Sequence, residues 1–128
     1  MATYGITWHA VVVEPDTFAA NRDFITRLHG VEPTLEMDGL VMFTFPDGTR
    51  LELRTPQMTP SYGLNPDGIA FGYRVDDVAE TSEQLAAAGA ELLGEITRMP
   101  QFDYARRHYR GPDGRIYGIN ETKPQPTA

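Results

Sequence analysis

A short pattern that occurs twice limits what this chain can fold into. Pro-Asp-Gly stands at 46–48 and again at 112–114, and each copy is followed by a strand-like run of alternating side chains. Pro pre-sets φ for a turn, Asp accepts hydrogen bonds from nearby backbone, and Gly tolerates a positive φ. Each copy therefore predicts a β-hairpin. Because the copies lie about half of the chain's length apart, we interpret the chain as two fused modules that share one site.

The residues before the first turn predict a β-α-β-β-β order. β-Branched and aromatic residues predict a strand over 6–13. Apolar residues at helical spacing predict a helix that begins with Asp16 as its N-cap and stops at Gly30. The remaining three strands are expected at 31–36, 40–45 and 49–54.

The same order restarts after a segment that contains three prolines. A helix capped by Asp76 and Asp77 and stopped by Gly89 is expected in the second half. Its strands are expected at 68–75, 91–97, 104–110 and 115–120. We therefore predict one domain over 1–128, made of module one at about 5–55, a linker at 56–67, module two at about 68–121 and a disordered tail at 122–128.

Composition narrows the classes of function. The chain has no cysteine, which removes disulfides and thiolate metal ligands. Its formal net charge of −7 disfavours nucleic-acid binding, because neutralising phosphates requires clusters of Lys and Arg. No apolar run is long enough to span a bilayer, and the first residues do not resemble a signal peptide. We therefore expect a cytoplasmic protein with neither a membrane nor a nucleic acid as partner.

Two β-α-β-β-β modules, each with an aspartate after its first strand and a Pro-Asp-Gly hairpin before its last, resemble the vicinal oxygen chelate superfamily. The stretches Val-Asp-Asp-Val at 75–78 and Gly-Pro-Asp-Gly at 111–114 are typical of it. The superfamily includes glyoxalase I, bleomycin-resistance proteins, methylmalonyl-CoA epimerase and extradiol dioxygenases. The resemblance implies an α+β fold in which two tandem βαβββ modules form an open, cleft-containing mixed sheet, often completed by a homodimer.

The resemblance also implies where a metal would bind, because the family's ligands typically come from the first and last strands of each module. The matching positions are His9 and Glu52 in module one, and Ala70 and Gly118 in module two. Ala and Gly have no ligating side chain, and catalytic zinc usually keeps three protein ligands. We therefore expect no complete metal site and no cofactor. A divalent metal held by His9 and Glu52 and completed by substrate is the alternative.

Side chains alternate between the two faces of a strand, which predicts the residues that line the cleft. Leu51 and Leu53 are expected to face the helix, and the fold implies that His9 faces the cleft beside Glu52. The other ligand-binding positions predicted in this way are Arg50, Arg54, Ala70, Gly72, Arg74, Gly118 and Asn120. We interpret the small residues among them as room for an organic molecule. The alternative is that they let another strand or a dimer partner pack closely.

Three functions compete. The favoured one is a protein of the bleomycin-resistance kind that binds a small organic molecule without a metal. The second is an enzyme of the glyoxalase, epimerase or cyclase type, in which His9 and Glu52 act as an acid–base pair. The third is a dimeric structural or regulatory module with a vestigial cleft. His108 alternates with Arg106 and Arg110 on one strand; this face is within reach of an anionic ligand, but we interpret it as solvated.

Overall fold

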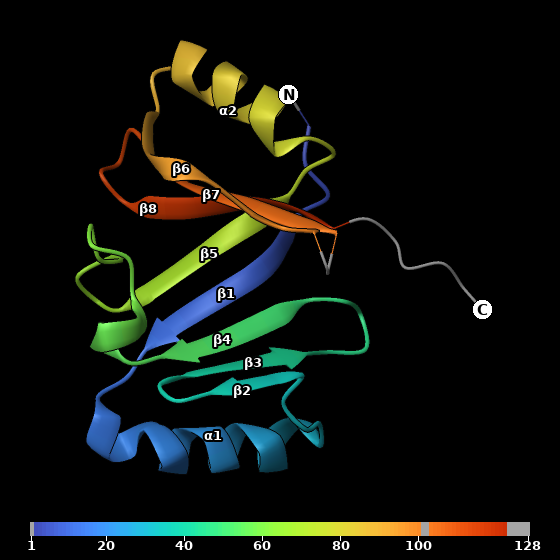
Figure 1. Ribbon diagram of the computed structural model, residues 1–128, viewed down its shortest axis with the longest axis vertical. Helices are drawn as coiled ribbons and strands as arrows, with labels where there is room; N and C mark the ends of the chain where they lie inside the picture. Colours follow the sequence, from blue (N-terminus) through green and yellow to red (C-terminus); the bar gives the residue numbers. More distant parts are fainter. Residues whose placement is uncertain (1, 101–102, 123–128) are drawn as a thin grey trace. The chain divides into compact units, whose positions relative to one another are not determined.

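The computed structural model describes residues 2–100 and 103–122, which form two α-helices, one short 3₁₀-helix and eight strands (Figure 1). Contacts within the chain divide it into two compact units. We call Thr7–Phe71 the N-terminal unit, and Met1–Ile6 together with Gly72–Ala128 the C-terminal unit. The predicted disordered tail lies almost wholly outside the described residues.

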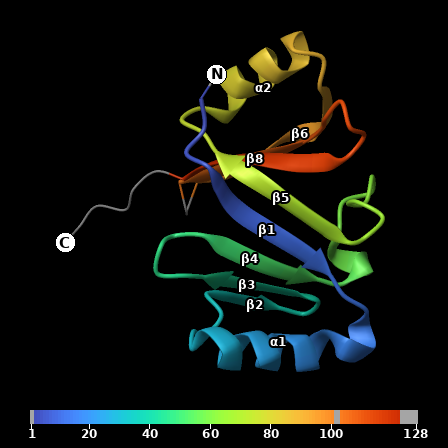
Figure 2. The ribbon, with the colours of Figure 1, turned by 180° about the vertical axis from the view of Figure 1, so that it is seen from behind.

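The N-terminal unit contains α1 (Pro15–His29), the 3₁₀-helix η1 (Pro56–Met58), most of β1 (Ile6–Val12) and the beginning of β5 (Ile69–Arg74). Its other strands are β2 (Leu35–Met37), β3 (Leu40–Thr44) and β4 (Arg50–Arg54). The strands lie in the order β2-β3-β4-β1-β5, with β4 parallel to β1 and antiparallel to β3. In Figures 1 and 2, α1 runs beside the β2–β3 hairpin.

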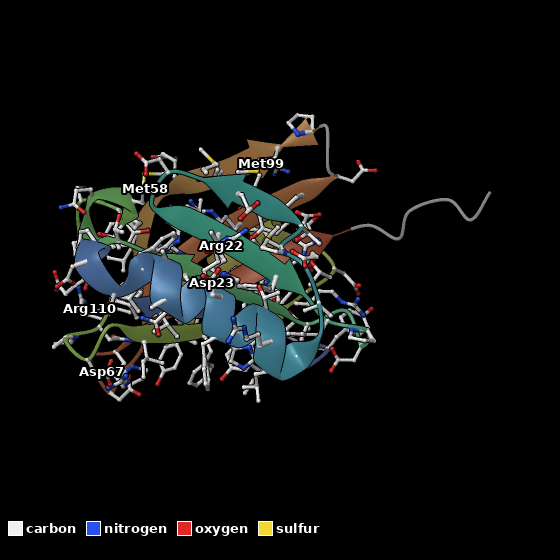
Figure 3. The ribbon with its side chains drawn as sticks, turned by 90° about the horizontal axis from the view of Figure 1, so that it is seen from below. Arg22, Asp23, Met58, Asp67, Met99 and Arg110 are labelled. Carbon is white, nitrogen blue, oxygen red and sulfur yellow. The ribbon has the colours of Figure 1, made fainter. Side chains whose placement is uncertain are left out.

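Apolar residues of β3 and β4 fix α1 on one face of this sheet. Val41, Phe43 and Leu53 are almost fully buried, and Phe18 and Ile25 of α1 pack against them. At the rim of the same contact, Arg22 of α1 forms ion pairs with Asp23 and with Glu36 of β2. Figure 3 labels Arg22 and Asp23 on the side of α1 that lies next to this hairpin. One face of the sheet is therefore an apolar core, and the other is turned away from the helix.

The C-terminal unit repeats this arrangement with α2 (Val78–Ala87) and the end of β5. Its other strands are β6 (Glu91–Met99), β7 (Tyr104–Arg110) and β8 (Ile116–Thr122), and the order is β5-β8-β7-β6. β5 and β8 are parallel, and the other two pairs are antiparallel. Its core consists of four buried residues, Val75, Val78, Ala105 and Ile119. The partly buried Leu85 and Tyr109 pack against them.

Both Pro-Asp-Gly segments form the predicted turns. Asp47 accepts hydrogen bonds from the backbone N–H and the hydroxyl of Thr49, at 3.0 and 2.7 Å. Asp113 accepts from the backbone N–H of Arg115 at 2.9 Å and from the hydroxyl of Tyr117. The glycine that follows each aspartate has a positive φ, 86° and 81°, which is why glycine is favoured there.

The predicted α+β class with two βαβββ modules is confirmed, whereas several boundaries differ. Pro15 opens α1 and Glu14 precedes it, so Asp16 lies in the first turn and is not the N-cap. Gly30 ends α1 in the left-handed conformation as predicted, and Asp77 caps α2 by accepting from the Glu80 N–H at 2.9 Å. β2 starts at Leu35, four residues later than expected at 31. None of the described helices is long and apolar enough to cross a membrane.

Candidate functional site

The pairing of β1 with β4 decides which predicted residues share a face. Ala10 lies opposite Glu52, and His9 lies opposite Leu51. Residues paired across neighbouring strands project to the same face. Glu52 therefore lies on the face of Ala10, whereas His9 lies on the face of Leu51, which packs toward α1. The prediction that His9 and Glu52 are neighbours on one cleft face is wrong, because a one-residue difference in register reverses the face of a side chain.

His9 is exposed and lies near the first Pro-Asp-Gly turn. The pKa of Asp47 is lowered, mainly by the hydrogen bond from the Thr49 side chain, and the positive charge of His9 adds a smaller lowering effect. His9 is therefore close enough to this turn to interact electrostatically with it. Nothing on its face of the sheet pairs it with Glu52.

Glu52 and Arg54 form a buried ion pair on the face turned away from α1. Arg54 Nε donates to Glu52 Oε2 at 2.9 Å, and the two side chains are only about a tenth exposed. Arg54 Nη1 also donates to the carbonyl oxygen of Met58 at 2.6 Å. Arg50 lies on the same face, opposite Trp8. The prediction that Arg50, Glu52 and Arg54 share a face is confirmed, and the charge of Glu52 is already matched by Arg54.

Ala70 belongs to an apolar cluster of the N-terminal unit. It is 1% exposed and packs with Trp8 and Ala10, and Leu64 covers them in part. Neighbouring side chains thus fill the space around this predicted ligand-binding position.

In the C-terminal unit the predicted face is confirmed by register. Gly72 pairs with Gly118, and Arg74 pairs with Asn120, so these four side-chain positions face away from α2. Two residues of β7 join them on this face, because His108 pairs with Gly118 and Arg106 with Asn120.

Gly72 lacks a side chain because another strand lies against it. A Cβ atom at this position would meet the carbonyl oxygen of Gly118 at 2.5 Å, closer than real Cβ contacts come. At Gly72 the alternative prediction, close packing of a strand, is therefore correct. The space expected there for an organic molecule is occupied by backbone.

His108 is 3% exposed, so the predicted solvated face around it is wrong. Its Nε2 atom lies 3.3 Å from Nη1 of Arg106. Asn120, on the next strand, is 7% exposed. The prediction was wrong because a strand that contains several arginines has the composition of a solvent-exposed strand. Alternation places His108 and Arg106 on one face of β7, but only the register with β8 shows that Gly118 and Asn120 share that face.

Arg74 is held at the edge of this face by an aromatic ring. Its guanidinium carbon lies 4.5 Å from the centroid of the Tyr4 ring, in a cation–π contact. Tyr4 in turn donates to Asp76 at 2.6 Å, and this hydrogen bond raises the pKa of Tyr4. Arg74 therefore interacts with groups of its own unit.

The donors do not fit a metal ion. In residues 2–100 and 103–122, no three or more His, Asp or Glu side chains are grouped so that they would hold one. His9 and Glu52 lie on opposite faces, and Ala70 and Gly118 supply no ligand.

Two surface hollows have no predicted site residue in their linings. The larger, of about 390 Å³, is in the N-terminal unit and is lined by Pro15, Phe18, Asp38, Gly39, Thr55, Gln57 and Met58. The smaller, of about 160 Å³, is in the C-terminal unit and is lined by Arg98, Pro100, Asp103, Tyr104, Ala105 and Glu121. Neither lining contains a residue predicted to bind ligand.

A comparison with models of known protein families shows which superfamily the chain belongs to. The Glyoxalase/Bleomycin resistance protein/Dioxygenase superfamily matches residues 9–115. The chain belongs to this superfamily. The resemblance drawn from the repeated modules is thereby confirmed. A comparison with curated proteins found no match.

Solved structures share the fold at low sequence identity. Methylmalonyl-CoA epimerase from Mycobacterium tuberculosis is 16% identical, with a TM-score of 0.70 over 95% of this chain and 90% of that one. A variant of methylmalonyl-CoA epimerase from Streptomyces coelicolor, in complex with 2-nitronate-propionyl-CoA, is 15% identical, with a TM-score of 0.68 over 96% of this chain and 100% of that one. A superfamily member from Vibrio splendidus 12B01 is 18% identical, with a TM-score of 0.61 over 91% and 99%. Identities this low show a common fold only.

Proposed function

We propose that this protein binds a small organic molecule on a sheet face turned away from the helices, and that it does so without a complete metal site. The observation that carries the proposal is the burial of polar side chains on these faces. Glu52 and Arg54 in the N-terminal unit, and His108 and Asn120 in the C-terminal unit, are all at least nine-tenths buried. Buried polar groups on a sheet face are unusual, whereas binding sites require them for specificity.

The faces toward the helices give the contrast. There the buried residues are apolar, as in Val41, Phe43 and Leu53 beside α1 and Ile119 beside α2. A sheet that served only as a scaffold would not need buried polar side chains on either face. The structural relatives support the same class of function, since one of them was solved in complex with 2-nitronate-propionyl-CoA.

The donor set supports binding without a metal. Glu52 is paired with Arg54, and His9 lies on the other face. For the same reason we do not propose that His9 and Glu52 transfer a proton together. A homodimer and a cytoplasmic location stay predictions.

Two measurements test the proposal. Metal analysis of the purified protein, before and after incubation with Zn²⁺, Ni²⁺, Mn²⁺ and Fe²⁺, is expected to find far less than one equivalent per chain. One equivalent that is lost in Glu52→Gln would contradict the metal-free part of the proposal.

A thermal-shift screen of small organic acids, amines and neutral heterocycles is expected to give saturable binders. Their affinity should fall in Asn120→Leu and stay unchanged in Arg107→Gln, because Arg107 lies on the opposite face of β7. A screen without a binder would refute small-molecule binding.

A further inference from the structure

We propose that the ligand carries an oxyanion, a carboxylate or a phosphate, and that Arg106 and Asn120 bind it. This inference rests on the proposed function and adds a ligand class to it. It concerns the face of the C-terminal unit turned away from α2.

Hydrogen-bond donors lie in one row across four strands. Thr97 of β6 pairs with Arg106 of β7, Arg106 pairs with Asn120 of β8, and Asn120 pairs with Arg74 of β5. Neighbouring strands are about 4.8 Å apart, and paired residues project to the same side. We call Thr97, Arg106, Asn120 and Arg74 the donor row. The row contains no carboxylate, although the whole chain has a net charge of −7.

Arg106 has neither the acidic partner of Arg110 nor the aromatic ring that covers Arg74. Arg110 lies 3.3 Å from Glu91, and Arg74 lies over the Tyr4 ring. Across the described part of the chain, no carboxylate lies within ion-pair distance of Arg106, and its side chain is partly buried. A cation removed from water without a counter-ion is costly. An anion bound at this position would remove that cost.

His108 positions the guanidinium of Arg106. Arginine has only donors, so in the 3.3 Å contact the Nε2 atom of His108 must accept. Because His108 is 3% exposed, its ring is fixed by packing and limits the directions in which Arg106 can point. We assign His108 as a positioning residue.

Asn120 supplies a neutral donor next to this charge. It is 7% exposed, and its amide makes no hydrogen bond to the other residues that the structure describes. Its two N–H groups are therefore available to a ligand from within the sheet face. A ligand group that accepts hydrogen bonds would pair with this amide, whereas an apolar group would leave it without a partner.

The combination fits an oxyanion. A guanidinium offers two parallel N–H donors that match a carboxylate or a phosphate, and charge-assisted hydrogen bonds are the strong ones. An amide beside it can donate to the remaining oxygen. A cationic ligand, which the acidic composition favours, would meet Arg106 and Arg74 here and be repelled.

Titration of the ¹⁵N-labelled protein with sodium malonate, inorganic phosphate and malonamide tests the inference, with the Arg Nε–H and Asn Nδ2–H signals as the readout. Malonate or phosphate should produce saturable shifts at Arg106 and Asn120, and neutral malonamide should not. Preference between the two anions identifies a carboxylate or a phosphate. Arg106→Gln should weaken the binding about tenfold or more. Arg107→Gln, which removes the same charge from the opposite face, should leave it unchanged, since Arg107 donates to the Gly94 carbonyl oxygen at 2.8 Å.

Arg106→Lys keeps the positive charge but removes the two parallel N–H donors of the guanidinium. This variant should bind malonate and phosphate more weakly than the unaltered protein, even where its spectrum shows an intact fold. The inference is overturned if neither anion gives a saturable shift, or if both anions bind Arg106→Gln as tightly as the unaltered protein. The proposed function fails by a different result, the absence of any binder in the screen. Binders that are all neutral or cationic would keep the proposed function and refute the oxyanion.

Discussion

The two units have the same order of elements and the same Pro-Asp-Gly turn. They differ in the contacts that an arginine makes on the sheet face turned away from the helix. In the N-terminal unit, Arg54 donates hydrogen bonds to Glu52 and to the Met58 carbonyl oxygen. In the C-terminal unit, Nη1 of Arg106 contacts Nε2 of His108 at 3.3 Å. The charge of Arg54 is therefore matched by a carboxylate of the protein, whereas that of Arg106 has no carboxylate partner among the described residues. Duplicated modules can thus share a fold and still differ in how the charge of an arginine is matched.

The paired first and last strands of each unit show a second difference. β1 carries Ala10 opposite Glu52, whereas β5 carries Gly72 opposite Gly118. A Cβ atom fits at Ala10, which is fully buried, but one at Gly72 would collide with the Gly118 carbonyl oxygen. The missing side chain at Gly72, a predicted ligand-binding position, is therefore no sign of empty space.

Breaking the buried pair of the N-terminal unit should have the largest effect. Glu52→Ala leaves the Arg54 charge buried without its partner. The expected loss in free energy of unfolding is about 3–5 kcal/mol, measured by urea denaturation. The matched change in the C-terminal unit is Glu91→Ala, which opens the exposed pair between Glu91 and Arg110. It should cost about 0–1 kcal/mol.

Replacing both members of the pair, as in Glu52→Leu with Arg54→Met, should restore much of the stability, because neither charge is then left alone. A loss in the double variant that equals the sum of the two single losses would show that the charges do not act as a pair.

The glycine contrast predicts the next largest effect. Gly72→Ala should lower the free energy of unfolding by about 1–3 kcal/mol, because the added methyl group meets backbone that cannot rotate away. The reverse change in the N-terminal unit, Ala10→Gly, should cost only about 0.5–1 kcal/mol from lost burial and added chain freedom. Urea denaturation of both variants measures this, and a Gly72→Ala variant as stable as the original would refute close packing at this strand pair.

Local patterns explain what could be predicted from the sequence. The strand over 104–110, the stop at Gly30 and the cap at Asp77 each depend on a few neighbouring residues, and the structure agrees at all three. The face assignment in the C-terminal unit was also predictable, because apolar or aromatic residues alternate there with small or polar ones, as in Phe-Gly-Tyr-Arg at 71–74 and Tyr-Gly-Ile-Asn at 117–120. The family followed from the order and duplication of these local signals.

Register between distant strands explains what could not be predicted. Whether His9 or Ala10 lies opposite Glu52 depends on how β1 slides along β4, and neither strand contains a signal that fixes this. The burial of His108 likewise depends on strands that pair with it from both sides. Alternation gives faces within a strand, but a site assembled from several strands requires the offsets between them.

The aromatic pair of the C-terminal unit predicts a smaller effect, at alkaline pH. Burial raises the pKa of Tyr109 to about 12 from its ordinary value of 10.0, and its ring stacks on Tyr117 at 5.8 Å. A raised pKa in the folded state means that stability is complete below pH 10 and declines as the pH rises toward about 12. Unfolding followed by urea between pH 9 and pH 12 should show this decline, and Tyr109→Phe should reduce it. An unchanged decline in that variant would assign it to another group.

The two turns predict the smallest effect and compare the units directly. The pKa of Asp47 is lowered mainly by the hydrogen bond from the Thr49 side chain, and that of Asp113 mainly by the hydrogen bond from Tyr117. A lowered pKa in the folded state gives stability that is present above about pH 3.8 and lost as the pH falls through the folded value. Thermal unfolding between pH 5 and pH 2 should therefore depend less on pH in Asp47→Asn and in Asp113→Asn. Thr49→Val should flatten the dependence that comes from Asp47 alone, and Tyr117→Phe the one from Asp113. A variant that carries both Thr49→Val and Asp113→Asn should depend on pH less than either single variant. If its pH dependence of thermal unfolding equalled that of a single variant, the two turns would not contribute independently to stability.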